Sequence, residues 1–164
     1  VGRNVARIAK GFGMKVSALD PWVKDEDMLA DGITPVHSVE ELYQNNQYVS
    51  LHIPATPQTK KSVGKALIEL MPKNGVLINT ARKEVIDEES LAEALAARED
   101  VRYVADVKPD IAAELEEKYP ERVLFTPKKM GAQTAEANIN AGLAAANQVA
   151  MHLKDGWNRF QVNK

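Results

Sequence analysis

The chain has 164 residues, of which 45% are hydrophobic, and its formal net charge is -2, from Lys+Arg 21 and Asp+Glu 23. These counts are typical of one globular domain with a sizeable core and exclude a disordered chain. The isoelectric point near 6.0 gives no broad basic surface for nucleic acid, and no stretch approaches the roughly 20 apolar residues of a membrane span. The sequence has no cysteine, which excludes a disulfide scaffold and a thiolate metal site. We therefore expect a cytoplasmic domain with no nucleic-acid, membrane or metal partner.

Helix-like and strand-like segments alternate along the chain. The first is a helix over residues 3–10, where Val5, Ile8 and Ala9 form one apolar stripe. The other expected helices cover residues 38–44 and 67–71, a segment that begins at Asp87, and residues 134–154. The expected strands cover residues 14–19, 48–53, 75–79, 101–106 and 123–125. This alternation predicts an α/β fold with a doubly wound parallel sheet.

The last of these helices has the clearest pattern. Its apolar positions recur at steps of four and three residues, at Ile139, Leu143, Ala146, Ala150 and Leu153. The many alanines along it leave room for a neighbouring backbone to approach closely.

The ligand of a doubly wound sheet binds beyond the carboxyl ends of the strands. We therefore expect the functional residues directly after each strand. These positions are Asp20, residues 52–54, residues 80–82, Asp106 and residues 126–134.

The chain opens with Val1-Gly2-Arg3, which leads straight into a helix. The last glycine of a G-x-G-x-x-G motif opens the first helix of a dinucleotide-binding unit in the same way. We therefore expect the first strand and the two earlier glycines of the motif to be missing from this sequence, and to be present in the native protein. The alternative interpretation of Gly2 is an ordinary N-terminal turn.

Asp20 follows Gly2 at about the interval expected for the acidic residue of that motif. A carboxylate there can accept hydrogen bonds from both adenosine ribose hydroxyls and would repel a 2′-phosphate, which favours NAD over NADP. The nearby Lys24 weakens this preference. Alternatively, Asp20-Pro21 is an ordinary turn pair.

Taken together, the strand-end segments resemble the D-isomer-specific 2-hydroxyacid dehydrogenases. Besides residues 1–3 and 18–21, the segments that carry the resemblance are residues 49–54, 56–59, 78–82, 86–88, 105–107, 126–127 and 131–134. Within the family, residues 79–83 and 128–138 are most similar to the short D-3-phosphoglycerate dehydrogenases. The resemblance implies a Rossmann-like NAD-binding domain and a small 2-hydroxy acid as substrate.

The resemblance also implies roles for single residues. Arg82 matches the arginine that holds the substrate carboxylate, for which a guanidinium fork is well suited. Thr80 and Ala81 would line the nicotinamide pocket, and Asp106 would accept a hydrogen bond from the carboxamide. His52 and Pro54 match the segment beside the adenine. Without the resemblance, Arg82 would be a surface ion-pair residue, Asp106 a turn residue and His52 a loop histidine.

The expected catalytic base departs from the family pattern. The family has a histidine after Thr126-Pro127, where this sequence has Lys128 and Lys129. We favour Lys129, because Gly131 and the residues after it set the alignment better than Thr-Pro does, and we keep Lys128 as the alternative. A lysine acts as a base only if its pKa falls from about 10.4 toward neutrality. Otherwise the two lysines hold substrate anions, or the site is inactive.

The family's base is paired with a glutamate, for which Asp110 is our first candidate and Glu114 the second. Lys83-Glu84 replaces the small residues that usually follow the family's arginine, and the sequence offers no reason for this change.

The resemblance implies oxidation of 3-phosphoglycerate to 3-phosphohydroxypyruvate, the first step of serine biosynthesis. The alternatives are a glyoxylate or hydroxypyruvate reductase and a non-catalytic NAD-binding interaction module. It also implies an NAD-binding domain over residues 1–153, in which residues 134–153 form an interdomain crossover helix. Residues 154–164 would return to a substrate domain mostly absent from this sequence. We expect this piece to be inactive alone and the whole protein to be a homodimer.

Overall fold

The computed structural model of the chain describes residues 1–127 and 134–161. The chain divides into two compact units, Val1–Lys128 and Lys129–Lys164. The predicted end of the NAD-binding domain at residue 153 stays a prediction.

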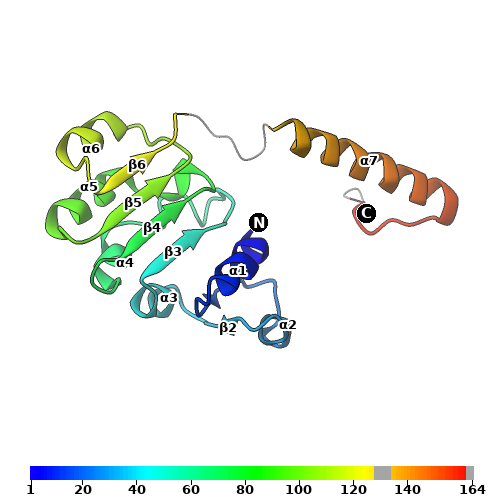
Figure 1. Ribbon diagram of the computed structural model, residues 1–164, viewed down its shortest axis with the longest axis horizontal. Helices are drawn as coiled ribbons and strands as arrows, with labels where there is room; N and C mark the ends of the chain where they lie inside the picture. The colour runs from blue at the N-terminus through cyan, green and yellow to red at the C-terminus, as the bar shows by residue number, and fades with distance from the viewer. Residues whose placement is uncertain (128–133, 162–164) are drawn as a thin grey trace. The chain divides into compact units, whose positions relative to one another are not determined.

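A four-stranded parallel sheet forms the centre of the first unit. Its strands are β3 (Tyr48–Leu51), β4 (Val76–Asn79), β5 (Arg102–Ala105) and β6 (Val123–Phe125), side by side in chain order (Figure 1). The helices that connect them are α4 (Lys65–Leu70), α5 (Glu88–Ala97) and α6 (Ala112–Lys118), and a short 3-10 helix, η1 (Lys83–Val85), follows β4. The predicted α/β fold with a parallel sheet is confirmed.

A second, smaller parallel sheet lies at the start of the chain. It pairs β1 (Ser17–Ala18) with β2 (Thr34–Pro35); α1 (Gly2–Gly11) precedes it in the chain, α2 (Asp25–Ala30) connects its strands, and α3 (Val39–Asn45) leads on to β3. Among the described residues, no strand pairs with both β1 and β3. The described structure thus has two separate parallel sheets, and their order matches the two sides of a doubly wound sheet of order 3-2-1-4-5-6 on either side of its first strand.

The main core lies against one face of the four-stranded sheet. Alternate strand residues are buried there, among them Leu51, Leu77 and Tyr103, because successive side chains of a strand point to opposite faces. The connecting helices add apolar side chains such as Ile68 and Leu95. A smaller cluster of Ala6, Met28 and Ile33 packs beside β1 and β2.

Helix ends follow the expected capping chemistry. The Ser38 hydroxyl accepts a hydrogen bond from the Glu41 N–H at 3.0 Å and begins α3. The Asp87 carboxylate caps α5 by accepting from the Ser90 N–H at 3.3 Å. Both predicted helix starts are therefore confirmed.

The strand expected over residues 14–19 is wrong in length, because β1 contains Ser17–Ala18 alone. In the described chain this strand pairs with β2 on one side only, so no second ladder extends it. The sequence prediction also missed α2, β2, η1 and α6, all of which are short.

The second unit is dominated by α7 (Ala135–Asp155), which confirms the helix predicted over residues 134–154. The Thr134 hydroxyl caps its start by accepting from the Ala137 N–H at 3.0 Å, and Gly156 ends it in the left-handed conformation. In the described parts of the chain, no helix is both long enough and apolar enough to cross a bilayer.

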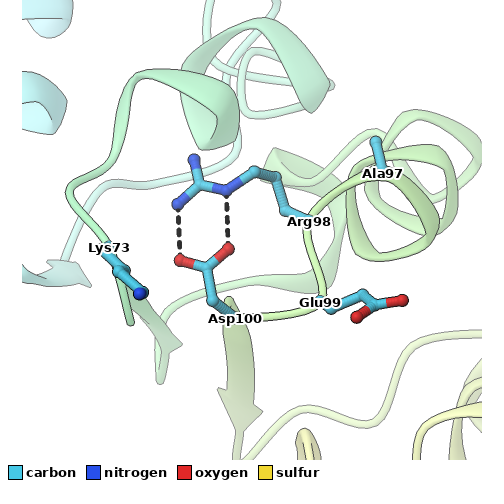
Figure 2. A pocket seen from close by; sticks show the side chains of 5 residues that line it. All are labelled: Lys73, Ala97, Arg98, Glu99 and Asp100. Atoms are coloured by element: carbon cyan, nitrogen blue, oxygen red, sulfur yellow. Dashed lines mark hydrogen bonds and ion pairs between the residues drawn. The ribbon is translucent and has the colours of Figure 1, made fainter.

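A bidentate ion pair lies in the loop between α5 and β5, at the amino end of the sheet (Figure 2). Arg98, which follows α5, donates from Nε and Nη2 to the Asp100 carboxylate at 2.8 Å each. Its Nη1 also donates to the carbonyl oxygens of Glu69 and Met71, at the end of α4, at 3.1 and 3.2 Å. Asp100 in turn accepts from the Asn74 N–H at 2.7 Å. The pocket around this pair is therefore a structural joint, since its arginine and aspartate satisfy each other.

Replacing Asp100 by asparagine is expected to lower the free energy of unfolding by about 2 kcal/mol at neutral pH. The hydrogen bond from Arg98 holds the pKa of the Asp100 carboxyl well below its ordinary value. A lowered pKa stabilises the fold above the ordinary aspartate pKa, and this contribution is lost as the pH falls toward the folded-state value. Urea unfolding of both proteins between neutral and acidic pH measures the difference, which should shrink below about pH 4. A difference independent of pH would contradict this account.

Candidate functional site

The four strands of the main sheet end in one row. Leu51 of β3 pairs with Asn79 of β4, Asn79 with Ala105 of β5, and Ala105 with Phe125 of β6. The residues that follow these strand ends include the predicted site residues His52, Thr80 and Asp106, together with Thr126. The parallel sheet therefore brings four of the expected segments to a single edge.

Backbone hydrogen bonds between neighbouring strands continue just past the strand ends. The Asp106 N–H donates to the carbonyl oxygen of Asn79 at 3.3 Å, and the Thr126 N–H donates to that of Ala105 at 3.1 Å. The Thr126 hydroxyl also donates to the Asp106 carbonyl at 3.2 Å. The row therefore continues one residue past the strands.

Helix α1 begins against this edge. A Cβ atom built on Gly2 would lie 3.3 Å from Cδ2 of His52, so a larger residue at this position would press on the imidazole. Figure 1 shows the start of α1 beside the end of β3. The first amides of a helix carry partial positive charge and bind phosphate readily. The place of Gly2 is thus suited to a ligand phosphate at the edge of the sheet.

His52 is half-buried, and its Nε2 lies 3.0 Å from the Ser50 hydroxyl. Burial lowers the pKa of its imidazole. A neutral ring is therefore favoured beside the start of α1. Pro54, two residues later, is exposed, and its carbonyl oxygen accepts from the Thr59 hydroxyl at 2.5 Å.

Asp20 lies beyond the end of β1 and is exposed. Its Oδ1 accepts a hydrogen bond from the Trp22 N–H at 2.9 Å, which is the turn geometry that an aspartate before proline favours. Within the described residues, Oδ2 accepts no hydrogen bond. The carboxylate thus closes a turn and still has an oxygen for a ligand hydroxyl.

Arg82 ends a turn of three residues after β4. The turn is held by the buried side chain of Asn79, whose Nδ2 donates to the Arg82 carbonyl at 2.9 Å and whose Oδ1 accepts from the Ala81 N–H at 3.0 Å. The Arg82 guanidinium is exposed, and its Nη1 donates to the Ala81 carbonyl at 2.8 Å. Thr80 is also exposed, so the turn presents both side chains to solvent.

The segment after Arg82 is fixed by a short parallel bridge. Val63 pairs with Ile86, and the Val63 N–H donates to the Val85 carbonyl at 3.1 Å. The Lys61 N–H donates to the Glu84 carbonyl at 2.8 Å. The backbone on both sides of Arg82 is therefore anchored.

One carboxylate oxygen of Asp106 is buried and accepts no hydrogen bond from the described residues. Its Oδ1 is shielded from solvent and has no hydrogen-bond partner among the described residues. Such orphaned acceptors are costly and are usually satisfied by a ligand or water. A carboxamide N–H would be a donor of the kind this oxygen lacks, so the chemistry of Asp106 is compatible with the nicotinamide end of NAD.

Asp110 is paired with the lysine that the sequence left unexplained. Lys83 Nζ donates to Asp110 Oδ1 at 2.6 Å, a contact that raises the pKa of the lysine. The Glu88 carboxylate accepts from the N–H groups of Asp110 and Ile111 at 3.0 and 3.2 Å. These bonds fasten the loop after Asp106 to the segment after Arg82, and the Asp110 carboxylate faces Lys83.

The remaining catalytic candidates are not brought to the edge by the described structure. Glu114 lies on α6 and accepts from Lys118 at 2.7 Å. Lys128 and Lys129 lie outside the described residues. Over the described ranges, no three histidine, aspartate or glutamate side chains are grouped as metal ligands.

The comparisons with known proteins agree with this architecture. Residues 1–128 match the family model described as D-isomer specific 2-hydroxyacid dehydrogenase, NAD binding domain. The chain therefore belongs to the D-isomer specific 2-hydroxyacid dehydrogenases, which confirms the predicted family and its NAD cofactor.

Three individual relatives are similar to nearly the whole length of this chain. The NAD+-bound crystal structure of 3-phosphoglycerate dehydrogenase from Entamoeba histolytica is 43% identical with a TM-score of 0.85, and it matches 100% of this chain and 52% of that one. D-3-phosphoglycerate dehydrogenase from Methanocaldococcus jannaschii is 34% identical over 94% of this chain and 29% of its own length. Hydroxypyruvate reductase from Thermotoga maritima is 31% identical over 93% of this chain and 50% of its own. The chain thus spans about half or less of these relatives.

Proposed function

We propose that the whole protein is an NAD-dependent dehydrogenase that oxidises 3-phosphoglycerate to 3-phosphohydroxypyruvate. The observation that carries this proposal is the single sheet edge at which the Arg82 turn adjoins the orphaned carboxylate oxygen of Asp106. The similarity to two phosphoglycerate dehydrogenases, at 43% and 34% identity, supports the choice of substrate.

Most of the residues at the edge are assigned to the cofactor. The Asp106 carboxylate accepts from the carboxamide, and Thr80 and Ala81 line the space beside the nicotinamide. The start of α1 at Gly2 would hold the pyrophosphate. At the adenosine end, Asp20 accepts from the ribose hydroxyls, and His52 and Pro54 flank the adenine. NAD, when bound, supplies the acceptor for the hydride.

Arg82 and a lysine act on the substrate. The guanidinium binds the carboxylate and stabilises the developing carbonyl oxygen. Lys129 takes the proton of the substrate's C2 hydroxyl group, so that the C–O single bond becomes a carbonyl as C2 is oxidised. Lys128 is the alternative base. Asp110 is the proposed carboxylate partner of that base. In this role its carboxylate would leave Lys83 and contact the base instead.

A spectrophotometric assay of the whole protein tests this function. With NAD and 3-phosphoglycerate, we expect NADH to form. NADH consumption with glyoxylate or hydroxypyruvate, at much higher kcat/KM, would instead indicate the reductase, which the similarity to the Thermotoga enzyme keeps as a second candidate. NAD binding without turnover of any hydroxy acid would indicate a non-catalytic interaction module.

Replacing Asp20 by serine is expected to shift the ratio of kcat/KM for NADP to that for NAD by about tenfold toward NADP, since a change of 1.4 kcal/mol is tenfold. The reason is that the substitution removes a negative charge that would repel the 2′-phosphate. Asp27, an exposed acidic residue of α2, is the matched control, and its serine variant should keep the wild-type ratio. Equal cofactor preference in the Asp20 variant and wild type would reduce Asp20 to a turn residue.

We also propose that the protein is a cytoplasmic homodimer. The absence of cysteine suits a reducing compartment, and the resemblance to a family that commonly pairs through its nucleotide domains supports the dimer. Light scattering of the whole protein measures the oligomeric state directly.

A further inference from the structure

Asn79 is a polar side chain inside the apolar core. It is the last residue of β4, it is 0% exposed, and it is the one buried polar residue among the parts of the chain that the structure describes. A buried primary amide costs free energy unless its donors and acceptor are all used. The partners of this amide therefore indicate why an asparagine occupies a position where leucine or valine would otherwise be expected.

The two shortest hydrogen bonds of the Asn79 amide hold the backbone of the turn that carries Arg82. Nδ2 donates to the Arg82 carbonyl at 2.9 Å, and Oδ1 accepts from the Ala81 N–H at 3.0 Å. One planar amide thus joins a carbonyl and an N–H of neighbouring residues. Since its donor and acceptor point in fixed directions, the amide specifies the conformation of the turn and the direction in which Arg82 leaves it.

A third, longer contact connects the amide to the next strand. Nδ2 lies 3.4 Å from the hydroxyl oxygen of Tyr103, on β5. The Tyr103 ring is buried and packs edge-on against Phe125 with centroids 5.8 Å apart. Burial raises the pKa of Tyr103 to about 12, so its hydroxyl stays neutral. The asparagine is therefore held against a rigid part of the core on one side and holds the exposed turn on the other.

We propose that Asn79 is a positioning residue for Arg82. Its amide fixes the conformation of the Ala81–Arg82 turn, so that the guanidinium is already oriented toward the substrate carboxylate before the substrate binds. This inference rests on the proposed dehydrogenase function, in which Arg82 is the carboxylate-binding group. Asn79 touches neither cofactor nor substrate and acts only through the turn. An aspartate could not replace it, because a carboxylate would face the Arg82 carbonyl with no donor to offer.

Steady-state kinetics of the whole protein separate positioning from general stability. In Asn79→Ala, we expect kcat/KM for the hydroxy acid to fall about 100-fold, as for a displacement of about 1 Å at a reacting centre, mainly through a higher KM. The dissociation constant of NADH, measured by fluorescence, should stay within about threefold, because four of the proposed cofactor groups, Gly2, Asp20, His52 and Asp106, lie on segments that Asn79 does not hold. Tyr103→Phe is the matched control: it removes the long contact, keeps both bonds to the turn, and should leave KM for the acid unchanged.

Two results would overturn the proposal. One is a wild-type kcat/KM in Asn79→Ala. The other is an equal loss of NADH affinity and kcat/KM, which would mark a general structural role.

Hydrogen exchange of the wild-type protein gives a second test that needs neither a folded variant nor turnover. The Ala81 amide should exchange at least about tenfold more slowly than that of the exposed Thr80, because Asn79 accepts its hydrogen bond. Equal exchange of the two amides would overturn the proposal. If the wild type oxidises no hydroxy acid, the proposed function fails, whereas the exchange rates still decide whether Asn79 holds the turn.

Discussion

Replacing Arg82 by methionine is expected to lower kcat/KM for the hydroxy acid about 1,000-fold, which corresponds to about 4 kcal/mol of transition-state stabilisation. Arg82 is the cation that we assign to the substrate carboxylate, and methionine keeps much of the side-chain length without charge or donors. Arg82→Lys should recover only part of the loss, because an ammonium cannot form the two parallel hydrogen bonds of a guanidinium. The dissociation constant of NADH should change little in either variant.

The control for this experiment is Arg102→Met. Arg102 is an exposed arginine at the start of β5, at the opposite end of the strand from the site. This variant should have wild-type kinetics. An Arg82→Met protein with kcat/KM within about threefold of wild type would remove the carboxylate-binding role, since the loss of even one good hydrogen bond to a charged group exceeds that change.

Replacing Lys129 by methionine is expected to lower kcat by about 100- to 10,000-fold, the range that a positioned general base contributes. Substrate and cofactor should still bind, because proton transfer does not hold either of them in the ground state. Activity of the wild type should rise with pH as the lysine loses its proton, and this pH dependence should disappear from the residual activity of the variant.

Lys128→Met is the direct comparison, and Lys73→Met, at the amino end of the sheet, is the control for loss of a positive charge. We expect Lys128→Met to keep most of kcat and Lys73→Met to keep all of it. If Lys128→Met abolishes turnover while Lys129→Met does not, the base is Lys128 and our alignment of the two lysines is wrong by one residue.

The fold could be predicted from the sequence where local chemistry and periodicity agree. Helix α7 and the caps at Ser38 and Asp87 appear in the structure as predicted, because each depends on residues within one or two helical turns. The edge of the site could be predicted as well, because parallel strands place all their carboxyl ends on one side. No side-chain contact was needed for that inference.

The parts that the sequence did not reveal depend on partners far away in the chain. Lys83 had no explanation until the structure placed it 2.6 Å from Asp110, which lies 27 positions later. Asn79 belonged to a recognised motif, but its role depends on burial, which a single polar letter in an apolar run does not reveal. A polar residue at the inward-facing end of a predicted buried strand is the signal that could have identified it.

The proposed dehydrogenase activity depends most on where Arg82 and the lysine base lie relative to the nicotinamide. A crystal structure of the whole protein with NAD and 3-phosphoglycerate measures this directly. We predict the Arg82 guanidinium on the substrate carboxylate, the Lys129 ammonium at the C2 hydroxyl, and both on the same face of the nicotinamide ring, with its carboxamide on Asp106. A structure in which the two cations lie on opposite faces of the ring, or in which protein fills the space between them, would contradict the account.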